Sequence, residues 1–200
     1  MSDWVALLRG VNVGGVTVRS AELGALFTEL GFDSVRTVLA TGNVLFSPEG
    51  GASPVERLAL KARIEAALGE RFGYDAWVVL EPRERMAQVV AAYPFTEDAA
   101  HHAYVVFGSD QDVLEELLGL GDEALPTAAS GTDAAPDAGS AGGAGGLGAN
   151  EERLAAGDGV LYWACPRGAS TNTFFAKLSS KARFKPHITT RNLNTVRKLL

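Results

Sequence analysis

Residues 3–15 read DWVALLRGVNVGG, and this stretch decides how the first half of the chain folds. Its first part, from Asp3 to Arg9, is a short apolar run, which is typical of a strand buried on both faces. The glycine-rich part from Arg9 to Gly15 cannot extend that strand. A helix is expected to follow, because Ser20 can cap its first turn and apolar residues recur behind it at helical spacing.

The residues up to position 81 complete a familiar order of strands and helices. The expected elements are strands over 35–40, 44–47 and 76–80 and a helix over about 54–71. With the first strand and helix they give βαββαβ, which is the ferredoxin-like order. A right-handed crossover makes the second strand parallel to the first, so its turn into the third strand lies at the same end of the sheet as the glycine-rich loop. We therefore expect Arg9–Gly15 and Thr41–Asn43 to meet.

The sequence predicts an α+β fold in which residues 1–81 form the ferredoxin-like subdomain and residues 82–200 form a second, smaller α+β subdomain. The elements expected in the second part are helices over about 83–92, 110–118, 171–180 and 191–200 and strands over 103–107, 151–155 and 160–165. Residues 126–149 consist almost entirely of Ala, Gly, Ser, Thr, Asp and Pro. Such a stretch cannot bury enough apolar area to offset an ordering cost of about 1–2 kcal/mol per residue, so a flexible surface loop is expected. No internal repeat of fixed period is visible.

Charge is distributed unevenly along the chain. Between Gly159 and Leu200 there are eight Lys or Arg and no Asp or Glu, whereas the whole chain holds 18 basic and 24 acidic residues and a net charge of −6. This asymmetry predicts either contact with an anion or an electrostatic match between the basic end and the acidic body. Lys177, Lys181 and Lys185 recur every four residues and share one face if a helix continues that far. The overall acidity argues against general nucleic-acid binding.

Several classes of protein are not expected from the composition. No apolar run approaches the ~20 residues needed to span a bilayer, and the first residues lack the basic and apolar regions of a secretory signal. Cys165 is the only cysteine, which favours a reducing cytoplasm. No metal site is predicted, because His101 and His102 are neighbours on an expected strand and point to opposite sides. No cofactor and no catalytic constellation are recognisable, so the sequence names no reaction.

Two stretches are candidates for holding an anion. Gly10, Gly14 and Gly15 lie between a strand and a helix, where glycines let backbone N–H groups turn toward a ligand. The alternative is a tight turn with no ligand. Thr190 can cap the last expected helix, which would place Arg191 at a helix N-terminus as a clamp for an anion. The alternative there is capping and packing alone.

Together these stretches give the hypothesis of a pocket for a small phosphorylated or nucleotide-like anion between the two subdomains. Its predicted ligand-binding residues are Arg9, Asn12, Gly14, Gly15, Asn43, Arg191 and Asn192. Two alternatives stay open. The basic C-terminal region can bind a nucleic acid or an acidic partner, or the chain can act as a non-catalytic protein-interaction module. The oligomeric state also stays open.

Three segments together resemble one known family. They are VALLRGVNVGG over Val5–Gly15, RTVLATGNVLFS over Arg36–Ser47 and TTRNLNTVRKL over Thr189–Leu199. In their order and spacing they are similar to the bacterial family of uncharacterised proteins catalogued as domain of unknown function 1697. This resemblance implies an α+β fold with two subdomains and no established activity. The chain departs from the family pattern at Leu193, where the family usually has Trp, and at 126–149, which looks like an insertion.

Overall fold

The structure, a computed structural model, describes residues 3–11, 17–40, 42–49, 53–122 and 152–200. The predicted site residues Asn12, Gly14 and Gly15 and the expected loop over 126–149 lie outside the described residues. No helix in the described ranges is long and apolar enough to cross a membrane.

The N-terminal half forms the ferredoxin-like sheet that the sequence predicts. Its elements are β1 (Trp4–Arg9), α1 (Ser20–Glu29), β2 (Asp33–Thr37), β3 (Asn43–Ser47), α2 (Pro54–Phe72) and β4 (Trp77–Pro82). The strands are antiparallel in the order β2-β3-β1-β4, with Leu7 opposite Asn43 and Arg9 opposite Trp77. This order follows from two right-handed crossovers, each of which skips one strand.

The C-terminal half repeats the same topology. After α3 (Arg85–Ala91), its elements are β5 (His101–Gly108), α4 (Gln111–Asp122), β6 (Arg153–Gly157), β7 (Val160–Pro166), α5 (Phe174–Ser179), β8 (Ile188–Asn192) and α6 (Leu193–Arg197). The strand order β6-β7-β5-β8 matches β2-β3-β1-β4 position by position, and its pairings are antiparallel. The second subdomain is thus another βαββαβ unit with two added helices, α3 and α6, so it is not smaller than the first, contrary to the prediction. The repeat is one of topology and not of sequence, so no fixed sequence period marks it.

The end of the chain differs from the prediction of a helix over 191–200. Residues 188–192 form β8 instead, and α6 follows it. The β-branched residues before Arg191 favour a strand, and β5 offers an edge with which they pair. The side chain of Asn192 caps α6, not that of Thr190 as predicted. Arg191 therefore lies within a strand and not at a helix N-terminus.

The helix predicted over 171–180 is also shorter in the structure. It spans α5 alone, capped at its start by Thr173, and a series of turns follows it. Lys177 lies on α5, whereas Lys181 and Lys185 lie in those turns. The three lysines therefore do not share one face of a continuous helix.

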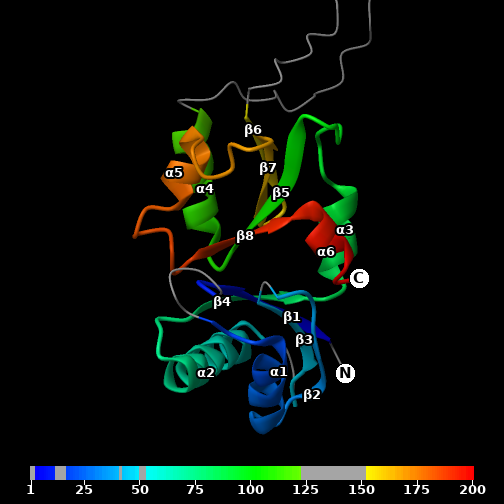
Figure 1. The fold of residues 1–200 in the computed structure, drawn as a ribbon, viewed down its shortest axis with the longest axis vertical. Coiled ribbons are helices and arrows are strands. Elements are labelled where there is room, and N and C mark those ends of the chain that lie inside the picture. The colour runs from blue at the N-terminus through cyan, green and yellow to red at the C-terminus, as the bar shows by residue number, and fades with distance from the viewer. Residues whose placement is uncertain (1–2, 12–16, 41, 50–52, 123–151) are drawn as a thin grey trace, which may run out of the picture.

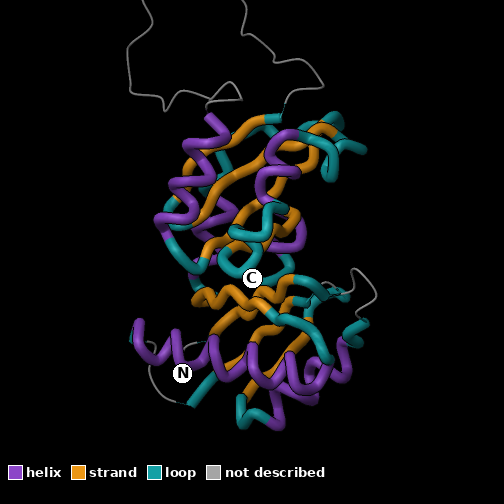
Figure 2. The backbone as a smooth tube through the Cα atoms, turned by 90° about the vertical axis from the view of Figure 1, so that its left-hand side faces the viewer, coloured by secondary structure: helices purple, strands orange, loops and turns teal. Residues whose placement is uncertain are grey.

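The described residues form three apolar cores, and two of them lie between a sheet and its own helices. Figure 1 shows the two subdomains stacked along the long axis, with α1 and α2 on the outer side of the first sheet and α4 and α5 beside the second. Figure 2 shows the same stacking from the side. The core under α1 and α2 contains Trp4 and Phe46, and the core under α4 and α5 contains Trp163 and Phe175.

The third core joins the two subdomains. It combines Val5, Leu7 and Val79 of the first sheet with Phe107 and Tyr162 of the second, and α3 and α6 contribute further residues. Because successive side chains of a strand point to opposite faces, one face of β1 packs into this core and the other packs into the core under α1 and α2. The helix-free face of the first sheet is therefore covered. It cannot act as an open platform on which nucleic-acid bases stack.

Candidate functional site

Three predicted site residues meet where the two subdomains touch. Arg9 ends β1, Asn43 begins β3, and Arg191 lies in β8, which contacts β1 and β4. We refer to Arg9, Asn43 and Arg191 as the arginine junction. The end of β1 meets the β2–β3 turn here, as predicted, because the backbone N–H of Leu8 donates to the carbonyl of Gly42 over 2.8 Å. Figure 1 shows β8 running across this boundary.

The guanidinium of Arg191 is buried and fully engaged. Its Nε donates to Oδ1 of Asn43 over 2.6 Å, and its Nη2 donates to the carbonyl oxygens of Leu8 at 2.5 Å and Gly42 at 3.2 Å. Its Nη1 donates to two oxygens of β8 itself, at 2.7 and 2.9 Å. All five N–H groups of the guanidinium thus have acceptors. Three of these hydrogen bonds reach across to the first subdomain.

All of these acceptors are uncharged oxygens, so no described residue is in direct contact with Arg191 as a counterion. Burial, together with the nearby charge of Arg9, lowers the pKa of Arg191 to about 10. The group stays protonated at neutral pH, because that value lies well above 7. The junction therefore holds a fixed, buried positive charge.

Arg9 approaches the same place from β1 and is half-buried. Its Nη1 donates to the carbonyl of Ile188 over 2.8 Å and its Nη2 to that of Ser179 over 3.3 Å, and burial lowers the pKa of Arg9. Within the described ranges its other three N–H groups have no acceptor. No ion pair joins Arg9 or Arg191 to a carboxylate of the described residues.

Asn192 lies apart from the junction, although it directly follows Arg191. Consecutive side chains of a strand point to opposite faces, and Asn192 lines a small hollow of about 60 Å³ together with His101, His102 and Arg167. The structure thus unites three of the four predicted site residues that it describes. The fourth serves as the cap of α6.

Metal binding and thiol reactivity depend on His, Cys, Asp and Glu side chains. Among the described residues, no group of three or more His, Cys, Asp or Glu side chains is placed to hold a metal ion. Cys165 is fully buried, and burial, assisted by the charge of Glu152, raises the pKa of its thiol to about 11. A buried thiol of this kind stays protonated at neutral pH and is a poor nucleophile.

Comparison with known proteins supplies the family. Residues 1–129 match the family described as "Protein of unknown function (DUF1697)". The chain belongs to this family. No curated protein matches the chain. Among solved structures, the conserved bacterial protein SP0830 from Streptococcus pneumoniae is similar over 99% of this chain and 96% of its own length, with 23% sequence identity and a TM-score of 0.68. At that identity the likeness concerns the fold alone.

Sequence reasoning missed a second set of contacts between the subdomains of this DUF1697 protein. Glu81 is buried in β4, where it accepts a hydrogen bond from Arg85 over 2.7 Å and lies 3.7 Å from Arg57. Arg85 also donates to the carbonyl of Asp158 in the second subdomain. Burial raises the pKa of Glu81 in spite of both arginines. Glu81 and Arg85 are only four residues apart, but Asp158 lies 73 residues from Arg85, so the sequence gives no sign of the contact between the subdomains.

A buried hydroxyl belongs to Tyr74, whose ring lies next to Gly10. The ring of Tyr74 packs against Gly10, where an added Cβ would stand 3.6 Å from the ring. Its hydroxyl oxygen is buried and has no hydrogen-bond partner among the described residues. Burial raises the pKa of Tyr74 to about 12. A buried hydroxyl without a partner costs about 1–3 kcal/mol of stability.

Replacing Tyr74 by phenylalanine is expected to raise the free energy of unfolding at pH 7 by about 1 kcal/mol, because the unpaired hydroxyl disappears and the ring stays. The folded protein keeps the Tyr74 proton up to about pH 12. An unfolded tyrosine loses its proton near pH 10, so stability falls as the pH rises through this window. The Tyr74→Phe protein should lose less stability than its parent over the same pH window. Urea unfolding of both proteins at pH 7 and at about pH 11 measures these effects. A variant less stable than its parent at pH 7 would show that the hydroxyl has a partner.

Proposed function

We propose that this protein binds a small phosphorylated or nucleotide-like anion at the arginine junction. One observation carries the proposal. Two guanidinium groups cross between β1 and β8, since Arg9 donates to the carbonyl of Ile188 and Arg191 donates to that of Leu8. Burial together with the charge of Arg9 lowers the pKa of Arg191. In the described part of the chain neither guanidinium is paired with a carboxylate.

An anion would relieve an electrostatic cost that the folded protein bears. Two like charges repel each other more strongly in a partly buried site than in water, and the buried charge of Arg191 has also lost its hydration. A phosphate group carries about −1.5 to −2 charges at pH 7, so one group can balance both guanidiniums. Arginine is also the side chain whose planar fork fits phosphate oxygens best. The chemistry therefore favours a phosphate group over a single carboxylate.

The two arginines have different roles in this proposal. Every N–H group of Arg191 already has an acceptor, so Arg191 contributes charge and not contact. Arg9 has three N–H groups without an acceptor among the described residues, and we assign the direct contact to it. Asn43 holds Arg191 in place, because its Nδ2 donates to the carbonyl of Val38 over 2.9 Å while its Oδ1 accepts from Arg191.

The neighbouring segment adds to the positive potential. Arg9 binds the carbonyls of Ser179 and Ile188, and the chain between these two points carries Lys181, Arg183 and Lys185, all exposed. Exposed cations around a site raise the local concentration of anionic ligands and the rate at which they arrive. The basic C-terminal region thus supports the same proposal as the junction.

A nucleic acid bound to this basic region is the second candidate function. The observation in its favour is that Lys177, Lys181 and Lys185 are exposed and have no ion pair within the described ranges. Against it, Arg183 pairs with Glu116 of α4 over 2.8 Å, so acidic side chains next to α5 already neutralise part of the region. We rank it below the small anion. In either case we place the protein in the cytoplasm, since a single buried thiol fits a reducing compartment.

Ligand-dependent melting tests the proposal. Inorganic phosphate, pyrophosphate and AMP are each titrated into the protein to millimolar levels. A ligand present at 100 times its dissociation constant should stabilise the fold by about 2.7 kcal/mol. Arg9→Gln should stay folded and bind at least tenfold more weakly, because a hydrogen bond to a charged group contributes about 1.5–3 kcal/mol.

Arg36→Gln is the matched control, since Arg36 is an exposed arginine on the edge strand of the same sheet. It should bind as the parent does. If none of the three probes shifts the melting temperature, or if Arg9→Gln binds them undiminished, the small-anion proposal fails. Single-stranded RNA is included across a salt series, because tight binding with a steep salt dependence would favour the second candidate. An Arg9→Gln protein that only loses stability would favour a protein-interaction module.

A further inference from the structure

The outer side of α2 is apolar although it faces solvent. Val55 and Leu58 are 77% and 68% exposed, more than any other large hydrophobic side chain in the described part of the chain. Ala59, Ala62 and Ala66 are exposed as well, and their spacing places them on the same side of the helix. We refer to these five residues as the outer face of α2.

In the monomer, the outer face of α2 is not the side that packs on the first sheet. α2 packs on the first sheet with its opposite side, where Ile64 and Leu68 are fully buried. Its ends are fixed independently, by a capping box on Ser53 and by the left-handed Gly73. Large aliphatic side chains grouped on a solvent-facing helix are typical of an interaction surface. The outer face of α2 therefore indicates a partner.

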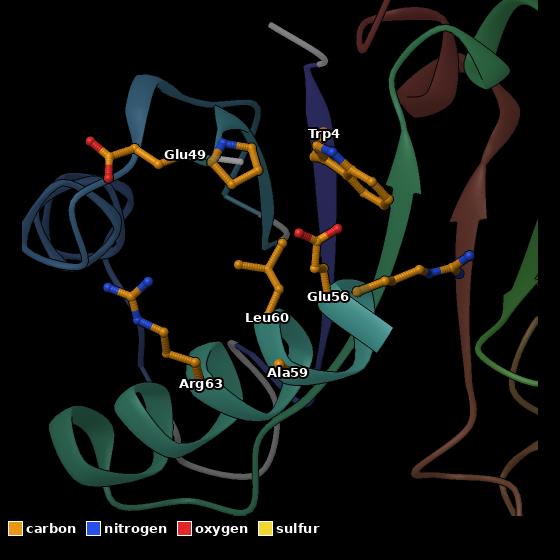
Figure 3. A pocket seen from close by; sticks show the side chains of 8 residues that line it. Trp4, Glu49, Glu56, Ala59, Leu60 and Arg63 are labelled. Atoms are coloured by element: carbon orange, nitrogen blue, oxygen red, sulfur yellow. The ribbon is translucent and has the colours of Figure 1, made fainter. Parts of the chain in front are cut away.

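A hollow of about 230 Å³ borders the outer face. Figure 3 shows it between α2 and the end of the first sheet, with Trp4 on one wall and Leu60 pointing into it from α2. Ala59 belongs both to this hollow and to the outer face. A cavity of about 150 Å³ holds a benzene molecule, so the hollow has room for one large apolar side chain.

We propose that a second copy of this chain covers the outer face, with the two α2 helices packed antiparallel about a twofold axis near Ala59 and Ala62. The large residues Val55 and Leu58 occupy the first half of the face, and the small residues Ala62 and Ala66 occupy the second half. A twofold axis turns one helix end for end, so each large side chain meets a small one of the partner. The outer faces of two copies therefore fit together, large residues against small ones.

The charged residues beside the outer face also match between two antiparallel copies. Glu56 and Arg63 are both exposed, lie about two helical turns apart and line the hollow. In an antiparallel pair the Glu56 of each copy comes beside the Arg63 of the other, in addition to the bonds that Glu56 accepts from the N–H of Ser53 and Arg63 donates to the carbonyl of Leu30. Charge therefore favours the same antiparallel arrangement as volume. Figure 1 places α2 on the side of the first sheet away from the second subdomain, so such a dimer leaves the arginine junction uncovered.

The measured mass in solution tests the dimer. Sedimentation equilibrium should give twice the chain mass, with dissociation on dilution. Leu58→Glu should raise the dissociation constant of the dimer about a hundredfold or more, because it places an unpaired charge at the centre of the interface. The matched control is Phe174→Glu, a similar change at an apolar side chain that is 45% exposed on α5. It should leave the mass unchanged, and thermal melting should show both variants folded.

A crosslink supplies the second measurement. Ala62→Cys lies near the proposed axis, so mild oxidation should join two copies through this residue. Cys165 should not interfere, because it is fully buried. Ala182→Cys, exposed in the turns after α5, is the control and should stay uncrosslinked. A protein that remains monomeric at its highest soluble concentration, a dimer that withstands Leu58→Glu, or equal crosslinking of both cysteine variants would overturn the proposal.

Discussion

Replacing Arg191 by alanine is expected to lower the free energy of unfolding by about 4 kcal/mol, the largest effect of any single polar side chain in this protein. Five hydrogen bonds disappear, and three of them join the subdomains. The side-chain oxygen of Asn43 and the carbonyl of Leu8 stay buried without this donor. A buried acceptor that loses its donor costs about 1–3 kcal/mol. The expected loss stays below the sum of these terms, because removing a buried charge recovers part of its desolvation cost.

Urea unfolding of the variant and its parent measures this loss. Arg197→Ala is the control, because Arg197 pairs with Glu97 at the surface, and such pairs contribute at most about 1 kcal/mol. Arg191→Lys should restore only part of the stability, since an ammonium group lacks the planar fork that reaches several acceptors at once. Similar small losses for Arg191→Ala and Arg197→Ala would mean that the arginine junction does not hold the subdomains together.

The second large loss, about 3 kcal/mol, is expected for Glu152→Ala. Glu152 is buried just before β6, where one carboxylate oxygen accepts from Nε1 of Trp163 and the other from the backbone N–H of Phe175, each over 3.0 Å. Alanine leaves both donors buried and unpaired. It also detaches the start of α5 from the second sheet, because Phe175 lies in the first turn of that helix.

Chemical unfolding followed by tryptophan fluorescence measures this loss, since Trp163 reports on its own surroundings. Glu152→Gln should fall between parent and Glu152→Ala, because an amide keeps one acceptor oxygen of the two. Glu115→Ala, an exposed glutamate of α4, should change the free energy of unfolding by less than about 0.5 kcal/mol. If Glu152→Ala were as mild as Glu115→Ala, water would have to satisfy both donors.

The first subdomain could be predicted because its signals are local. The helical spacing in α2 depends on residues that are close in sequence, and so does the turn before Asn43. The approach of the β2–β3 turn to the end of β1 followed from the handedness of one crossover. These inferences need no knowledge of the rest of the chain.

β8 and the arginine junction could not be predicted, because they depend on residues that are far apart in the sequence. The capping signal before α6 is real, but Asn192 provides the cap, and only pairing with β5 makes a strand of the preceding residues. The acceptors of Arg191 include the carbonyls of Leu8 and Gly42, which are backbone oxygens some 150 residues or more away in the chain. A carbonyl oxygen has no sequence signature. The sequence could name Arg191 and Asn43 as candidates but not the bond between them.

The late position of β8 in the chain sets an order of events during synthesis. The first subdomain has all of its strands once Pro82 has left the ribosome, and its helix-side core can form at that stage. At 5–20 residues per second, the ribosome needs roughly 6–24 s to add residues 83–200. Val5, Leu7 and Val79 are fully covered only at the end of that time, because β8 and α6 are the last elements of this stretch to be synthesised. An apolar sheet face that stays exposed during synthesis favours aggregation, so shielding of this face by a chaperone would help the first subdomain until the second one covers it.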